Sequence, residues 1–147
     1  MSHSFAKNHI HLVFSTKERR KTIAKEIQPQ LWSYMAGICR NQGIVAIAIN
    51  GMDDHAHVLL HLPPDIALAS AVNLIKTNSS KWMNREHGNF AWQEGYGAFS
   101  VSVSNTSAVA RYVRDQERHH RKRSFEDEYL TMLRKSGVEF DPKYVFE

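Results

Sequence analysis

The chain has 147 residues, of which 42% are hydrophobic and 23% charged, a composition typical of one soluble globular domain over residues 1–147. It contains no apolar run as long as a membrane span and no signal-peptide pattern, so we expect a cytoplasmic protein without a membrane partner. The single cysteine, Cys39, excludes an internal disulfide, and the net charge of +4 is compatible with a polyanionic partner.

The hydrophobic pattern predicts four strands and four helices. Alternating residues predict strands at 8–15, 44–50, 53–61 and 98–104. Helical spacing predicts helices at about 27–42, 66–87, 105–121 and 124–137. We expect a basic loop at 17–25 and a turn at Asn50–Gly51, and Ser124 with Asp127 resembles a capping box.

The order strand, helix, strand, strand, helix, strand is that of the ferredoxin-like, or split βαβ, fold of the α+β class. This fold is an antiparallel sheet with two helices on one face, and its first and third strands lie side by side at the centre. The remaining helices follow as C-terminal additions. We therefore expect the other sheet face to be open and available for a site.

Histidines are concentrated on one face of the third strand. Alternation places His55, His57 and His61 on one side, and small or branched apolar residues on the other. His9 and His11 of the first strand should share the histidine face. Two imidazoles at positions i and i+2 of a strand can ligate one ion, so the pattern favours a metal site. A solvated polar face rich in histidine is the alternative.

A second group lies on the third predicted helix. Tyr112 and Gln116 are four residues apart and hence on one helix face. The residues around this pair are strongly basic and give a field suited to phosphate. They are Arg111, Arg114, Arg118, Arg121, Lys122 and Arg123. A tyrosine at a helix–sheet contact and a merely charged surface are the alternative interpretations.

Together these motifs resemble the single-tyrosine HUH transposases of bacterial insertion sequences, including the REP-associated tyrosine transposases. The His-hydrophobic-His motif of that family reads DHAHVLL at residues 54–60, and its tyrosine helix reads YVRDQERHH at 112–120. The stretches WQEGYGAFSVS (92–102) and FEDEYLTML (125–133) also look like this family. The resemblance runs from about His9 to the C-terminus.

The resemblance implies a metal-dependent DNA endonuclease and strand transferase that cleaves and rejoins single-stranded DNA during transposition through a 5′-phosphotyrosine intermediate. Tyr112 is then the nucleophile, and His55, His57 and Gln116 hold a divalent ion, Mg or Mn. The further candidates that orient or assist these ligands are Asp53, Asp54 and His120. His9, His11 and His61 receive no role.

The resemblance also implies a bacterial homodimer that binds single-stranded DNA with hairpin ends, with composite active sites possible between the subunits. Our candidates for contact with DNA are Lys17, Arg19, Arg20, Lys21, Lys76, Lys81, Arg85 and Arg118. Trp82 and Trp92 are candidates for stacking on bases, with a place in the core or in an interface as the alternative. Two other functions stay open: a domesticated or non-catalytic DNA- or RNA-binding ferredoxin-like module, and a metal-dependent phosphoesterase with water as nucleophile.

Overall fold

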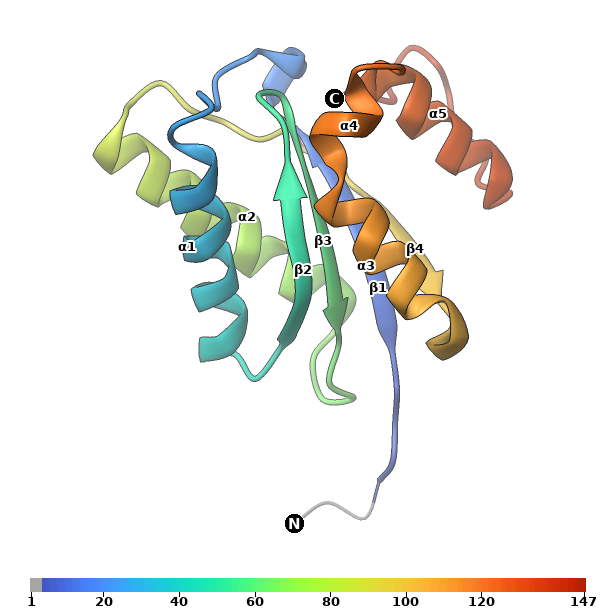
Figure 1. Ribbon diagram of the computed structural model, residues 1–147. Helices are drawn as coiled ribbons and strands as arrows, with labels where there is room; N and C mark the ends of the chain where they lie inside the picture. Colours follow the sequence, from blue (N-terminus) through green and yellow to red (C-terminus); the bar gives the residue numbers. More distant parts are fainter. Residues whose placement is uncertain (1–3) are drawn as a thin grey trace.

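The computed structural model describes residues 4–147 and contains a central antiparallel sheet of four strands (Figure 1). The strands are β1 (His9–Ser15), β2 (Val45–Gly51), β3 (His55–His61) and β4 (Gly97–Val101). Their order in the sheet is β2-β3-β1-β4, so the first and third strands are neighbours at the centre, as predicted. The α+β class and the ferredoxin-like arrangement are confirmed.

The helices follow the predicted order with some differences in extent. They are η1 (Lys17–Arg19), α1 (Gln28–Asn41), α2 (Leu68–Glu86), η2 (Val103–Asn105), α3 (Thr106–Arg114), α4 (Gln116–His120) and α5 (Phe125–Lys135), where η marks a 3₁₀ turn. Ser124 caps α5 by accepting a hydrogen bond from the amide of Asp127, as predicted. Among residues 4–147, no helix has both the length and the apolar character needed to cross a membrane.

Helices α1 and α2 cover one face of the sheet (Figure 1). The main core forms there, because the apolar side chains of β1 and β3 that point to this face pack against both helices. Its strand residues include Ile10, Leu12, Phe14, Ala56, Val58 and Leu60. Trp92 is buried in this core, where its indole N–H donates to Ser79 Oγ at 2.9 Å. Trp82 stacks on Tyr34.

The opposite face of the sheet is not open, and the expectation that it would be is wrong. Helices α3, α4 and α5 lie across it (Figure 1). Leu59 of β3 packs with Ala110 and Val113 of α3, and Val13 of β1 packs with the apolar side of α5. The C-terminal helices therefore bury the histidine face of the sheet.

The third predicted helix is two helices. Asp115, with φ −103° and ψ 30°, interrupts the helix between α3 and α4. The fourth strand also ends earlier than predicted, at Val101, because residues 103–105 form a 3₁₀ turn. Asn50 and Gly51 lie in β2 instead of a turn, and residues 52–54 make the connection to β3.

The last residues of the chain return to the sheet and hold α5 in place. Phe146 packs against Phe125 and Tyr129, with ring centroids 6.1 and 5.7 Å apart. The main-chain oxygen of Glu147 accepts hydrogen bonds from Gly95 N and Gln93 Nε2, both at 2.9 Å. The Gln93 Oε1 atom in turn accepts from the amide of Ser15 at 2.8 Å, so this tail connects α5 to the end of β1.

Gly51 stands where β2 closely approaches the start of β3. A Cβ atom at this position would lie 2.1 Å from the carbonyl oxygen of His55 and 2.9 Å from the ring of Trp32. The oxygen belongs to the strand backbone, so it cannot move without displacing the histidine strand.

We therefore expect Gly51→Ala to lower the free energy of unfolding by about 1–3 kcal/mol, the usual cost of an overpacked site. Gly37→Ala is the matched control: in α1 the added Cβ would meet only the Arg40 guanidinium, at 3.6 Å. Alanine is favoured over glycine inside helices by about 0.5–1 kcal/mol, so the control should be at least as stable as wild type. Denaturant unfolding measures both, and a Gly51→Ala protein of wild-type stability would contradict the steric argument.

Candidate active site

Four side chains from three elements converge between the sheet and the C-terminal helices. They are His55 and His57 of β3, His120 of α4 and Glu128 of α5. Their potential ligand atoms all lie within 4.8 Å of one another. Both strand histidines are 0% exposed and Glu128 is 3% exposed. This arrangement can bind a metal ion.

His55 is oriented by two neighbours. Its Nδ1 lies 2.7 Å from Asp54 Oδ1, and its ring stacks on Phe125 with centroids 4.1 Å apart. When Nδ1–H donates to the carboxylate, the lone pair of Nε2 faces the cluster, which is the usual arrangement of a metal-binding histidine. Asp54 is therefore well placed to orient the His55 ring. Asp53 instead lines a separate cavity of about 390 Å³, together with Lys21 and Arg114.

His57 has a corresponding partner in His11 of the neighbouring strand. His57 Nδ1 lies 2.8 Å from His11 Nε2, and His57 Nε2 lies 3.0 Å from Glu128 Oε1. Burial lowers the pKa of His57 to about 4 and that of His11 to about 3, so both rings are neutral at pH 7. A neutral His57 carries one ring proton: with no ion bound, Nε2–H can donate to Glu128 while Nδ1 accepts from His11 Nε2–H. With the proton on Nδ1 and donated to His11 instead, Nε2 would be free to act as a ligand. His11 has no predicted role, but its contact with His57 indicates that it orients that ring.

Glu128 lies at the centre of the polar contacts. Its Oε1 is 3.4 Å from His120 Nε2 and 3.8 Å from His55 Nε2, in addition to the contact with His57. Burial alone would raise the pKa of Glu128, but the hydrogen bonds from His120, His57 and Tyr112 outweigh it and lower this pKa well below its usual range. The same carboxylate raises the pKa of His120 against the opposing effect of burial.

Glu128 is not among the site residues predicted from the sequence, although the pattern of α5 carries a signal for it. Residues Phe125, Tyr129 and Leu133 define the buried side of α5, and Glu128 lies on that same side. A carboxylate on the apolar stripe of an amphipathic helix is unusual unless it has a buried partner.

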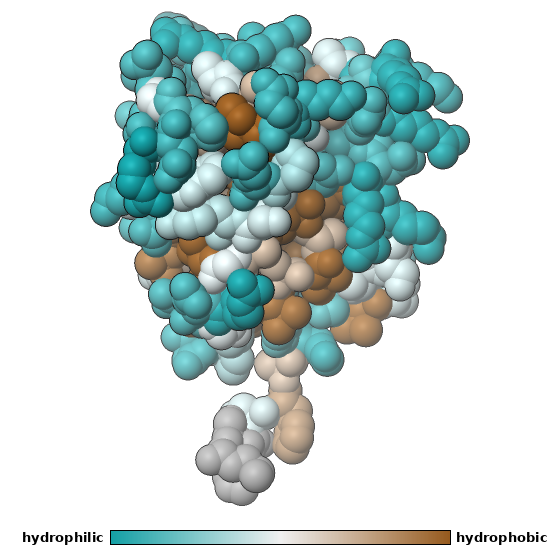
Figure 2. All heavy atoms as spheres, turned by 60° about the vertical axis from the view of Figure 1, so that its left-hand side comes forward, coloured by the Kyte–Doolittle hydropathy of each residue, from teal (hydrophilic) through white to brown (hydrophobic). Residues whose placement is uncertain are grey.

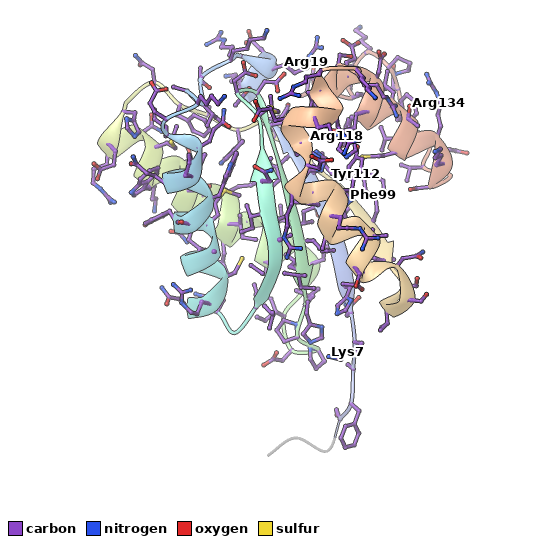
Figure 3. All side chains as sticks on the ribbon, in the orientation of Figure 1. Lys7, Arg19, Phe99, Tyr112, Arg118 and Arg134 are labelled. Atoms are coloured by element: carbon purple, nitrogen blue, oxygen red, sulfur yellow. The ribbon has the colours of Figure 1, made fainter. Side chains whose placement is uncertain are left out.

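Tyr112 and Gln116 reach the same cluster. Gln116 is fully buried, with Oε1 3.1 Å from His55 Nε2 and 3.0 Å from His120 Nε2. Tyr112 projects from α3 toward α5, and its hydroxyl donates a hydrogen bond to Glu128 Oε2 (Figure 3). Burial and then the Glu128 carboxylate raise the pKa of the Tyr112 hydroxyl. The tyrosine and the histidines that meet here belong to one chain.

Several of the basic residues selected as DNA contacts are held by other groups. Four arginines form ion pairs: Arg19 with Glu126, Arg20 with Glu18, Arg85 with Glu86 and Arg118 with Asp115. Lys76 Nζ donates to the main-chain oxygens of residues 93, 94 and 95 at 2.6–3.1 Å, and burial lowers its pKa to about 8.

The remaining lysine candidates line cavities at the surface. Lys17 lines two cavities near residues 91–94, and Lys21 lines the one beside Asp53. Lys81 lines a groove of about 610 Å³ between α2 and residues 91–96. Hydrophilic side chains cover much of the surface seen when the left side of Figure 1 is turned forward (Figure 2).

Known proteins are similar to this chain in sequence and in fold. The family of IS200-like transposases matches residues 4–116, from before β1 to the first residue of α4. The chain belongs to this family. Two relatives are each 25% identical in an alignment 114 residues long that covers 72% of this chain. One is the transposase of insertion sequence element IS200 from Salmonella typhimurium, with 74% of its length covered. The other is the ISDra2 transposase TnpA of Deinococcus radiodurans, with 81% covered.

Two solved structures have the same fold as this IS200-like transposase. A candidate transposase from Deinococcus radiodurans R1 aligns with a TM-score of 0.65 at 22% identity, over 79% of this chain and 95% of that one. A REP-associated tyrosine transposase bound to a REP hairpin aligns with a TM-score of 0.62 at 15% identity. This alignment covers 82% of this chain and 73% of that one. Membership of the family implies an enzyme that cleaves and rejoins DNA. His120 and Glu128 both lie beyond the residues that the family matches.

The buried neutral histidines predict a loss of stability in mild acid. The unfolded chain binds a proton on each of His11 and His57 near pH 6.5, whereas the folded protein resists protonation until about pH 3 to 4. Their stabilising effect is therefore complete above pH 6.5 and is lost as the pH falls. Each such proton adds a slope of about 1.4 kcal/mol per pH unit to the free energy of unfolding.

Denaturant unfolding of the metal-free protein, from about pH 7 to about pH 4, measures this slope. His11→Gln should flatten it by about one proton, and His87→Gln, which changes an exposed histidine at the end of α2, should not. The raised pKa of His120 acts in the opposite direction but is common to both variants. Equal slopes in wild type and His11→Gln would contradict the assignment of a buried, neutral His11.

Proposed function

We propose that this IS200-like transposase is a metal-dependent enzyme that cleaves and rejoins single-stranded DNA through a 5′-phosphotyrosine intermediate. The observation that carries the proposal is the contact between the Tyr112 hydroxyl and Glu128 at the edge of a buried cluster of metal-type ligands. A phenolic oxygen beside such a cluster is suited to attack a phosphodiester whose charge the cluster's ion offsets.

The donor set fits a divalent ion. His55 and His57 supply imidazole nitrogens, and Gln116 and Glu128 supply an amide and a carboxylate oxygen. His57 is neutral at pH 7, as a ligand must be, and Glu128 is ionised. When bound, the ion would polarise the scissile phosphate and offset the charge of its transition state. Oxygen ligands suit Mg and mixed nitrogen and oxygen ligands suit Mn, so we expect either ion to support activity.

The proposed reaction conserves the phosphodiester. The Tyr112 oxygen attacks the phosphorus, the bond from phosphorus to the 3′ oxygen breaks, and a 5′-phosphotyrosine and a free 3′-hydroxyl result. The phenol gives up its proton toward Glu128, and the departing 3′ oxygen takes up a proton. Phenolate, with a pKa of about 10 for its parent acid, is a tolerable leaving group, so the 3′-hydroxyl of another strand can reverse the step. No nucleotide cofactor is needed.

Single-stranded DNA with hairpin ends is the substrate that we propose. The structurally similar REP-associated tyrosine transposase is bound to a REP hairpin, which supports a hairpin partner here. Lys17 and Lys21, in the loop before α1, and Lys81, in the groove over α2, are the lysines best placed for phosphate contacts. A homodimer, with the tyrosine helix serving either its own histidines or those of the other subunit, is also part of the proposal.

The assignment of Tyr112 predicts a covalent protein–DNA adduct. The substrate is labelled single-stranded DNA from the hairpin ends of the insertion sequence that would encode this protein. Incubated with the protein and Mn²⁺, it should give a band of protein joined to DNA that survives boiling and is seen on a denaturing gel. Tyr112→Phe retains the ring, which packs 4.4 Å from His119, but removes the oxygen. DNA binding should therefore survive while the adduct falls below detection.

Tyr144→Phe is the matched control, because it removes a hydroxyl from a tyrosine that is 52% exposed and does not line the cavities of Lys17, Lys21 or Lys81. Its adduct should form as in wild type. An adduct that persists in Tyr112→Phe would place the nucleophile elsewhere. Cleavage by wild type without any adduct would instead indicate a phosphoesterase that uses water, and binding without cleavage would indicate a non-catalytic module.

A further inference from the structure

The two oxygens of Glu128 contact two different sets of groups. Oε1 faces the histidine nitrogens, the nearest being His57 Nε2 at 3.0 Å. Oε2 accepts the hydrogen bond of the Tyr112 hydroxyl. We propose that Glu128 bridges the divalent ion and the nucleophile, with Oε1 as a metal ligand and Oε2 holding the tyrosine oxygen. This inference rests on the proposed function and assigns a catalytic residue beyond the family-matched region.

The surroundings of Glu128 support a cation at this position. A buried carboxylate is costly unless a positive charge or several hydrogen bonds compensate it. Within residues 4–147, the ion-pair partners found for Glu128 are all histidines, and no arginine or lysine is among them. A divalent ion between Oε1 and the histidine nitrogens would compensate the buried charge of Glu128.

The position of Glu128 is fixed by the contacts of the residues before and after it on α5. One turn before it, Phe125 stacks on His55, and one residue after it, Tyr129 packs against Phe146 of the C-terminal tail. At the start of the helix, Arg19 pairs with Glu126 at 2.6 Å and lies over the Phe146 ring. These contacts hold the carboxylate in place without relying on the hydrogen bonds it makes.

Gln116 and Glu128 are therefore not equivalent ligands. The side-chain nitrogen of Gln116, Nε2, donates a hydrogen bond to the main-chain oxygen of Tyr112 at 3.2 Å. The side-chain oxygen, Oε1, faces His55 and His120. An amide is also uncharged, whereas Glu128 brings a full negative charge to the site. The charge and the tyrosine contact of Glu128 can be tested separately, because glutamine retains the acceptor oxygen but not the charge.

The test compares Glu128→Gln and Glu128→Ala with Asp127→Asn, which changes an exposed carboxylate at the preceding position of α5. Two measurements are made on each protein: Mn²⁺ binding without DNA, by calorimetry or electron paramagnetic resonance, and the rate of adduct formation at saturating Mn²⁺. Thermal unfolding verifies that each variant is folded, and Glu128→Gln preserves the shape of the side chain should the alanine variant not fold.

Both Glu128 variants should bind Mn²⁺ at least about tenfold more weakly, and Asp127→Asn should match wild type. At saturating Mn²⁺, Glu128→Gln should form the adduct faster than Glu128→Ala, because it still accepts from Tyr112. Wild-type Mn²⁺ affinity in Glu128→Gln would overturn the role as ligand. Wild-type adduct rates in Glu128→Ala, or equal loss in both variants at full occupancy, would overturn the bridge to Tyr112. If wild type binds Mn²⁺ through Glu128 but forms no adduct, the proposed function fails and the metal assignment stands.

Discussion

One ionised carboxylate, buried where water cannot solvate it, determines how the C-terminal part of this molecule is built. Glu128 needs positive or hydrogen-bonding partners, and it finds them in His57 of β3, His120 of α4 and Tyr112 of α3. These partners come from three elements, so the carboxylate requires α3, α4 and α5 to pack together over one face of the sheet. The break at Asp115 separates α3 from α4, and Tyr112 and Gln116 on its two sides both reach the cluster.

The sheet supplies the other half of the arrangement through its register. Antiparallel pairing sets Val13 opposite His57 and His11 opposite Leu59, so His11 and His57 are diagonal neighbours on one face. This geometry lets His11 hold the ring of His57, while Asp54 at the preceding turn holds His55. The close approach of Gly51 to the His55 carbonyl fixes where that strand begins. The two strand histidines are thus positioned by contacts within the sheet and its adjoining turn, without any contribution from the C-terminal helices.

The parts of the site that follow from local periodicity could be predicted from the sequence. Alternation places His55 and His57 on one face, and helical spacing brings Tyr112 and Gln116 together even though the helix is interrupted between them. Two features could not be predicted in this way. The covered sheet face depends on apolar packing between segments far apart in the chain, such as the cluster that joins Val13 of β1 to Phe125, Tyr129 and Leu133 of α5. Glu128 meets His57 across 71 residues, and no spacing rule connects a helix near the C-terminus to a strand that distant.

The central claim is that His55, His57 and Glu128 belong to a metal site and do not merely satisfy one another's hydrogen bonds. The most direct measurement is a crystal structure of the protein grown with Mn²⁺, with data collected to record anomalous scattering from manganese. The account predicts one strong peak between the Nε2 atoms of His55 and His57 and the Oε1 atom of Glu128. Full-occupancy manganese elsewhere, with His57 still hydrogen-bonded directly to Glu128, would contradict it.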